Sequence, residues 1–163
     1  MALSSDGLRV AVGAPGNTTF DNGTDAGRVR VYAWSGGFGD GGVGVWVQMG
    51  SDIKGEAAGD SSGNAVALSA DGSILAVGAS WNDGNGSNSG HVRVYELSGN
   101  SWIQLGQDID GEAAGDGQQA DGALHRHLRR GVELREQAAG KVRDELRAGG
   151  EGVAGPRRAE RVF

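Results

Sequence analysis

The sequence predicts an all-β fold built from a repeated four-stranded unit. Three observations lead to this prediction. Short segments recur in the same order, apolar residues within them alternate with period two, and Gly makes up 32 of the 163 residues. An excess of Gly without a collagen-like period of three indicates many turns. We expect two such units, followed by a segment of different character.

The repeat is legible over residues 1–116. Its longest identical element is GEAAGD, which occurs at Gly55–Asp60 and again at Gly111–Asp116. Four other pairs of segments align in order: ALSSDG at 2–7 with ALSADG at 67–72, AVGA at 11–14 and at 76–79, GRVRVY at 27–32 with GHVRVY at 90–95, and WVQMG at 46–50 with WIQLG at 102–106. The insertions between them fall in loops. The two units therefore cover about residues 1–60 and 61–116.

Each unit is expected to contain four short strands. In the second unit, these are expected near residues 64–69, 73–79, 91–97 and 101–106. Val92 and Val94 alternate with larger or polar residues, which is the strand period. Ile74–Val77 is a continuous apolar run of strand length, which favours burial on both faces. Asp6–Gly7 and Asp71–Gly72 predict tight turns, because Gly accepts a positive φ. GEAAGD then follows the fourth strand and is predicted to connect one unit to the next.

Repeated four-stranded units are typical of the blades of a β-propeller. GDSSGNAV at 59–66, VGAS at 77–80 and GHVRVY at 90–95, together with VGAP at 12–15, resemble the FG-GAP repeat of integrin α-chain propellers. The resemblance covers about residues 1–116. It implies an adhesion-type module located outside the cell or at its surface. The alternative is a WD-repeat propeller, but its blades of about 40–45 residues are shorter than these units.

Two departures from the family pattern bear on metal binding. Ser62 stands where the family has Phe, and Ser69–Gly72 occupies the place of the family's Asp-rich calcium loop with a single carboxylate. Calcium takes six to eight oxygen ligands. We therefore predict no calcium site, and no other metal or cofactor.

The loop at residues 80–89 holds the candidate binding residues. Trp81 has no Trp counterpart in the first unit, so it is the best candidate for an exposed contact, and Asn82, Asp83 and Asn85 surround it with polar groups. The other interpretation is that these Asn and Asp side chains hydrogen-bond their own backbone, as turn residues do. Trp46 and Trp102 recur at one position of the unit, which indicates packing between strands.

Three Asn residues in the loops begin Asn-x-Ser/Thr sequons: Asn17, Asn22 and Asn85. They suit N-glycosylation of a secreted protein. Loops rich in Asn, Gly, Ser and Thr also produce sequons by chance, and no signal peptide is recognisable at the start of this chain. The compartment therefore stays open.

No catalytic motif is recognisable in the sequence. It contains no Gly-x-Ser-x-Gly, no His-Glu-x-x-His, no phosphate loop and no Cys. Glu56 and Glu112 occupy equivalent connector positions, which indicates a structural role, and His91 aligns with Arg28 and is expected at the surface. We predict a non-catalytic propeller fragment that binds a protein or glycan, or serves as a structural piece of a larger propeller. The alternatives are a fragment of a propeller hydrolase or lyase whose active site lies in other blades, and a chain without an independent function.

Residues 117–163 break the pattern. They carry 10 basic and 7 acidic residues, against 5 and 14 in residues 1–116. The segment is rich in Arg and Gly and is either helical, disordered, or the product of reading a third blade in a shifted frame. Its interspersed acids and scarce aromatics argue against a nucleic-acid partner. No apolar run reaches the about 20 residues of a membrane span. Two blades cannot close a propeller, so we also expect self-association through unpaired blades.

Overall fold

The computed structural model describes residues 1–18, 22–36 and 43–117. The predicted Arg/Gly-rich tail lies outside the described residues from residue 118 onward. The described part is all-β, as predicted, and its ten strands follow one another along the chain. They are β1 (Ala2–Leu3), β2 (Arg9–Ala14), β3 (Arg28–Ser35), β4 (Val45–Gln48), β5 (Ile53–Lys54), β6 (Ser62–Leu68), β7 (Ile74–Ala79), β8 (His91–Ser98), β9 (Ser101–Gln104) and β10 (Ile109–Asp110).

The strands form two antiparallel sheets with the same topology. In the first sheet, β1, β2 and β3 are neighbours, and β4 and β5 both pair with β3. In the second sheet, β6, β7 and β8 are neighbours, and β9 and β10 both pair with β8. Each sheet thus has four strand positions, the fourth being interrupted by a turn. This confirms two propeller-type blades, which we call blade 1 (β1–β5) and blade 2 (β6–β10).

The interruption of the fourth strand has the same construction in both blades. The side-chain amide of Gln48 donates to Asp52 Oδ1 over 2.9 Å, and that of Gln104 donates to Asp108 Oδ1 over 2.6 Å. Each Gln also donates to a Gly carbonyl within its turn. The pair closes the turn and returns the chain to the sheet. The two-residue strands β5 and β10 were not expected from the sequence; they lie between the expected fourth strand and the GEAAGD connector.

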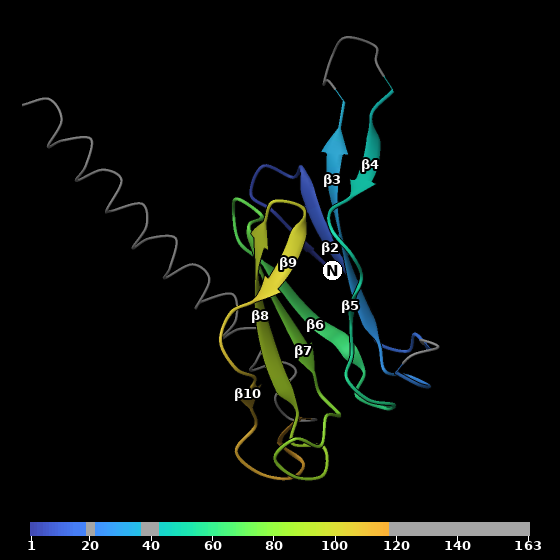
Figure 1. Ribbon diagram of the computed structural model, residues 1–163, viewed down its shortest axis with the longest axis vertical. Helices are drawn as coiled ribbons and strands as arrows, with labels where there is room; N and C mark the ends of the chain where they lie inside the picture. Colours follow the sequence, from blue (N-terminus) through green and yellow to red (C-terminus); the bar gives the residue numbers. More distant parts are fainter. Residues whose placement is uncertain (19–21, 37–42, 118–163) are drawn as a thin grey trace, which may run out of the picture.

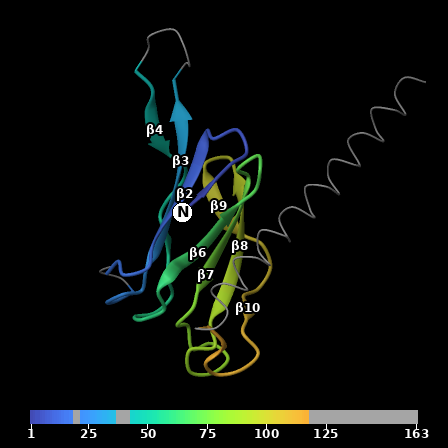
Figure 2. The same ribbon diagram turned by 180° about the vertical axis from the view of Figure 1, so that it is seen from behind.

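The core lies between the two blades, which pack face to face (Figures 1 and 2). Blade 1 contributes small aliphatic side chains, including Ala11, Val29 and Val31, and blade 2 contributes Leu75 and Val77. Leu75 and Val77 alternate along β7 with Ala76, which is buried in a second cluster on the opposite face. The expected burial of β7 on both faces is therefore confirmed. Burying each such Val or Leu side chain contributes about 1.5–3 kcal/mol.

Glycine lets the two backbones approach closely at the junction of the blades. A Cβ atom on Gly13 would lie 2.0 Å from the carbonyl oxygen of Gly63, and Gly63 itself has a φ of 87°. Ser62, which stands where the family has Phe, is fully buried beside them. The Gly of the Val-Gly-Ala segment is thus required by contact with the next blade.

The GEAAGD connector repeats because each copy makes the same hydrogen bonds. The backbone N–H of Gly59 donates to Thr24 O, and that of Gly115 donates to Ser87 O, each over 2.9 Å. Within the connector, the N–H of Ala57 donates to the Asp60 carboxylate, and the N–H of Ala113 donates to that of Asp116. Each connector is thereby held against the loop between the second and third strands of its own blade, and the first copy joins β5 to β6 as predicted.

Candidate functional site

The predicted loop residues divide into one exposed aromatic and several polar groups that hold the loop together. Trp81 is 46% exposed. Asn82 is buried: its Nδ2 donates to Asp60 Oδ2 over 3.2 Å, and its Oδ1 accepts from the N–H of Gly84 over 2.8 Å. This side chain therefore fixes the base of the loop and leaves Trp81 at its surface.

Asp83 and Asn85 also hydrogen-bond to the backbone. Asp83 Oδ1 accepts from the N–H of Asn88 over 2.7 Å, and Asn85 Nδ2 donates to the carbonyl of Gly111 over 2.9 Å. In blade 1, the equivalent Asn22 donates to the carbonyl of Gly55. These contacts agree with the interpretation of Asn and Asp as turn-forming residues. Ligand binding by this loop, and glycosylation at Asn17, Asn22 or Asn85, remain predictions.

The turn at Ser69–Gly72, where the sequence analysis considered a calcium loop, does not fit a calcium ion. The carboxylate of Asp71 accepts hydrogen bonds from the Ser69 hydroxyl over 2.7 Å and from the N–H of Ser73 over 3.0 Å. The Arg9 guanidinium also reaches this turn and donates to the carbonyl of Asp71 over 2.7 Å. The single carboxylate thus already closes the turn, and the Asp71 carbonyl already accepts a hydrogen bond from Arg9, so the turn offers few free oxygens to a calcium ion.

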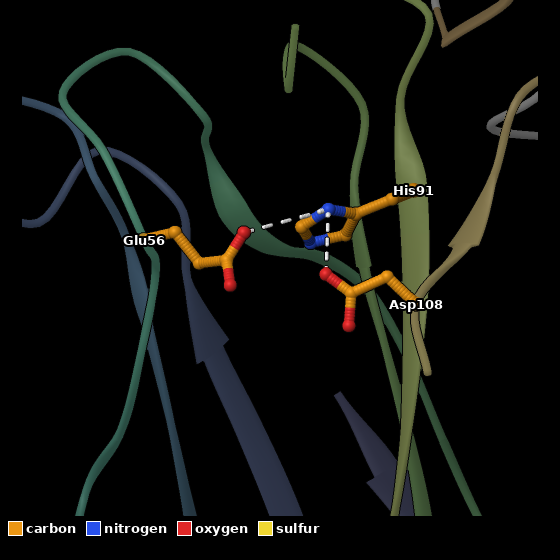
Figure 3. A group of neighbouring side chains, drawn as sticks. All are labelled: Glu56, His91 and Asp108. Carbon is orange, nitrogen blue, oxygen red and sulfur yellow. Dashed lines mark ion pairs between the residues drawn. The ribbon is translucent and has the colours of Figure 1, made fainter. Parts of the chain in front are cut away.

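A second group of polar side chains lies between the blades, and the sequence did not predict it. Glu56 extends from the connector after blade 1, while His91 begins β8 and Asp108 precedes β10 (Figure 3). His91 Nδ1 lies 3.6 Å from Asp108 Oδ2 and 4.0 Å from Glu56 Oε2. The imidazole is almost fully buried, whereas half of the Glu56 side chain is exposed. We call these three residues the interblade cluster.

The expected surface position of His91 is wrong. The register of β7 and β8 pairs His91 with Ala79 and Tyr95 with Leu75, so these side chains share the face that packs against blade 1. His91 is only 3% exposed as a result. Burial, and secondarily the nearby Arg93 guanidinium, hold the pKa of His91 below its ordinary value.

Arg93 connects the interblade cluster to the end of blade 1. Its Nη1 lies 3.3 Å from Glu56 Oε1, and its Nη2 donates to the carbonyl of Lys54 over 3.3 Å. Arg93 is itself buried. Its contact with Oε1 leaves the other carboxylate oxygen of Glu56 directed at the imidazole.

Blade 1 has two arginine–aspartate ion pairs at the equivalent positions. Arg28, the counterpart of His91, pairs with Asp52 over 3.2 Å, and Arg30 pairs with the same carboxylate over 2.7 Å. Two guanidinium groups thus surround Asp52, and they hold the pKa of that carboxyl at about 2. Its counterpart Asp108 faces an imidazole instead. The replacement of Arg by His is the sequence signal that could have revealed the cluster.

Comparison with known proteins agrees with this architecture. Residues 54–95 match the family model of the FG-GAP repeat. The matched segment runs from β5 through the connector, β6 and β7 into β8, so it includes two members of the interblade cluster, Glu56 and His91. A search of the curated proteins found no match to the chain. Within the described part of the chain, no helix has the length and apolarity that a membrane span requires.

Proposed function

We propose that the protein is a non-catalytic module that docks against further blades and binds a protein or glycan through its loops, because residues 54–95 match the FG-GAP repeat and that repeat suggests a propeller-type module. The same family resemblance supports a place for it outside the cell or at the cell surface. The docking part of this proposal rests on a comparison between equivalent faces of the two blades.

One face of blade 1 points away from blade 2 and carries large apolar side chains. We call it the outward face. The register of β1 to β4 puts six of its side chains next to one another. They are Leu3, Val10, Val12, Tyr32, Trp34 and Trp46. Leu3, Val12 and Trp46 are each more than a third exposed. The β3–β4 hairpin that carries Trp46 extends past the second sheet in both views (Figures 1 and 2).

The same face of blade 2 is covered. The counterparts of Val10, Val12 and Tyr32 are Leu75, Val77 and Tyr95, which are buried against blade 1. The surface that covers them consists of small aliphatic side chains, chiefly Ala11, Val29, Val31 and Ile53. This single observation carries the docking proposal. The outward face has the composition of a surface that receives another blade, and the partner is a strand face rich in Ala and Val from a further repeat.

A matched pair of substitutions tests the docking proposal. Val12→Asp places a charge on the outward face, and Val77→Asp places the same charge at the equivalent covered position. We expect Val12→Asp to leave the thermal midpoint nearly unchanged and to weaken association, measured by light scattering over a range of concentrations. Val77→Asp should destabilise the fold by about 3 kcal/mol or more, since it buries an unpaired charge.

Equal loss of stability in the two variants would mean that the outward face is already covered within one chain. Unchanged association in Val12→Asp would show that this face does not dock. Binding through the loops is tested separately by substitution of Trp81.

A further inference from the structure

The interblade cluster is a group of three ligand-type side chains that the proposed function does not use. We propose that Glu56, His91 and Asp108 bind a divalent transition-metal ion, with zinc the best fit, and that the ion joins the end of blade 1 to blade 2. The proposal is independent of what the loops bind.

The spacing of the three side chains is close to that of a metal site. Zinc binds His nitrogen and carboxylate oxygen at about 2.0–2.2 Å, so neighbouring ligand atoms of a tetrahedral site lie about 3.4 Å apart. The separations of His91 Nδ1 from Asp108 and Glu56 are 3.6 and 4.0 Å. All three ligand atoms lie within 4.8 Å of one another. The His91–Asp108 separation is close to that between ligand atoms of a tetrahedral site, and the half-exposed Glu56 side chain is the ligand that would move to complete the site.

The donor set favours zinc over calcium. Imidazole nitrogen and carboxylate oxygen are both ligand atoms that zinc accepts, and an open zinc site has three protein ligands with water in the fourth position. Calcium and magnesium prefer oxygen alone, and calcium needs six to eight such ligands. The half-exposed Glu56 side chain places one edge of the cluster at the protein surface.

The comparison with blade 1 supplies the second observation. Arg28 and Arg30 compensate the charge of Asp52, whereas in blade 2 the first of these positions is His91, and Arg93 pairs with Glu56 instead of Asp108. Two carboxylates therefore converge on one almost fully buried imidazole. Asp108 accepts a hydrogen bond from Gln104, and within the described residues no guanidinium group pairs with it. A bound cation would compensate the charge of Asp108, as Arg28 compensates that of Asp52 in blade 1.

Arg93 has a positioning role in this arrangement. Its contact with Glu56 Oε1 and its hydrogen bond to the carbonyl of Lys54 fix the carboxylate so that Oε2 faces His91. Groups that orient a ligand in this way raise the affinity of a metal site.

The test uses the full-length chain after removal of metal with a chelator. The sequence contains two other His residues, His125 and His127. Both are replaced by Asn in every sample so that zinc bound there is not counted. Zinc chloride is then titrated by calorimetry, and the thermal midpoint is measured with and without zinc. We expect one zinc ion per chain and a rise of about 3 °C or more at saturating zinc.

Three variants decide the assignment. His91→Arg recreates the pairing found in blade 1, so the fold should persist while the zinc-dependent rise disappears. Glu56→Gln alters a half-exposed side chain and should weaken zinc binding at least tenfold. Asp52→Asn, which removes the equivalent carboxylate of blade 1, should leave zinc affinity unchanged. The proposal is overturned if the His125→Asn/His127→Asn protein binds no zinc, or if His91→Arg and Glu56→Gln bind zinc as tightly as their parent.

Discussion

Asp60, the last residue of the first connector, accepts a hydrogen bond over 3.2 Å from the side-chain amide of Asn82 in blade 2. The same carboxylate accepts the N–H of Ala57 within the connector. The carbonyl of Asp60 also accepts the N–H of Trp81. One buried Asp therefore joins the connector that leaves blade 1 to the loop that follows β7.

Asp60→Ala should be more destabilising than Asp116→Ala. Asp116 occupies the same place in the second connector and accepts the same internal N–H, but it is less buried than Asp60. Loss of Asp60 leaves the buried Asn82 amide without this acceptor, which costs about 1–3 kcal/mol. Chemical denaturation of the two variants measures the difference. Equal losses would show that the link to Asn82 adds nothing to stability.

The ion pairs of Asp52 predict a loss of stability in acid. Hydrogen bonding from Arg30 lowers the pKa of Asp52 from 3.8 to about 2. Because the folded-state pKa lies below the ordinary value, the stabilisation is present above about pH 4 and is lost as the pH falls through about 2. Asp52→Asn should therefore be less stable than the wild type at neutral pH, by about 1 kcal/mol for a partly exposed pair. Denaturation curves at several pH values should show that this difference shrinks in acid; a constant difference would contradict it.

The repeat made most of the fold predictable. Each strand of blade 2 had an aligned partner in blade 1, so boundaries such as those of β7 and β8 could be placed within a few residues. The strands β5 and β10 could not be found in this way. A two-residue strand shows no period, and the turn before it is recognisable only from the hydrogen bond between Gln48 and Asp52.

The interblade cluster could not be predicted from the sequence, for a different reason. Alignment correctly equated His91 with Arg28, but it does not say which face of a blade meets its neighbour. That face is covered in blade 2 and more open in blade 1, so equivalent residues have different environments. Asp108 and Glu56 approach His91 only through this packing of one blade on the other.

Calcium should not change the stability of the protein. The turn at Asp71 has one carboxylate, which already accepts hydrogen bonds from Ser69 and Ser73, and the interblade cluster offers too few oxygens. Thermal unfolding in millimolar calcium and in excess chelator, with magnesium as the control ion, measures this. A reproducible rise of more than about 2 °C with calcium alone would contradict the prediction, because an ion that binds the native state must stabilise it.

Substitutions of Trp81 and Trp102 should distinguish a side chain that is free to contact a ligand from one that stabilises the fold by packing. Trp81 is exposed on a loop whose base is fixed by Asn82. Trp102 packs against the core between the blades, and its indole N–H donates to the carbonyl of Met49 in blade 1 over 2.9 Å. Trp102→Ala should therefore lower the free energy of unfolding by about 3 kcal/mol, while Trp81→Ala should change it by less than about 0.5 kcal/mol.

The binding measurement uses an immobilised glycan panel and, separately, extracellular-matrix proteins. If the loop is a contact surface, wild-type protein binds at least one of these ligands, and Trp81→Ala weakens that binding, because an exposed aromatic supplies contact area at little entropic cost. Trp46→Ala is the matched control, since Trp46 is equally exposed but lies on the outward face. If Trp46→Ala abolishes binding and Trp81→Ala leaves it unchanged, the contact surface is the outward face and not the loop.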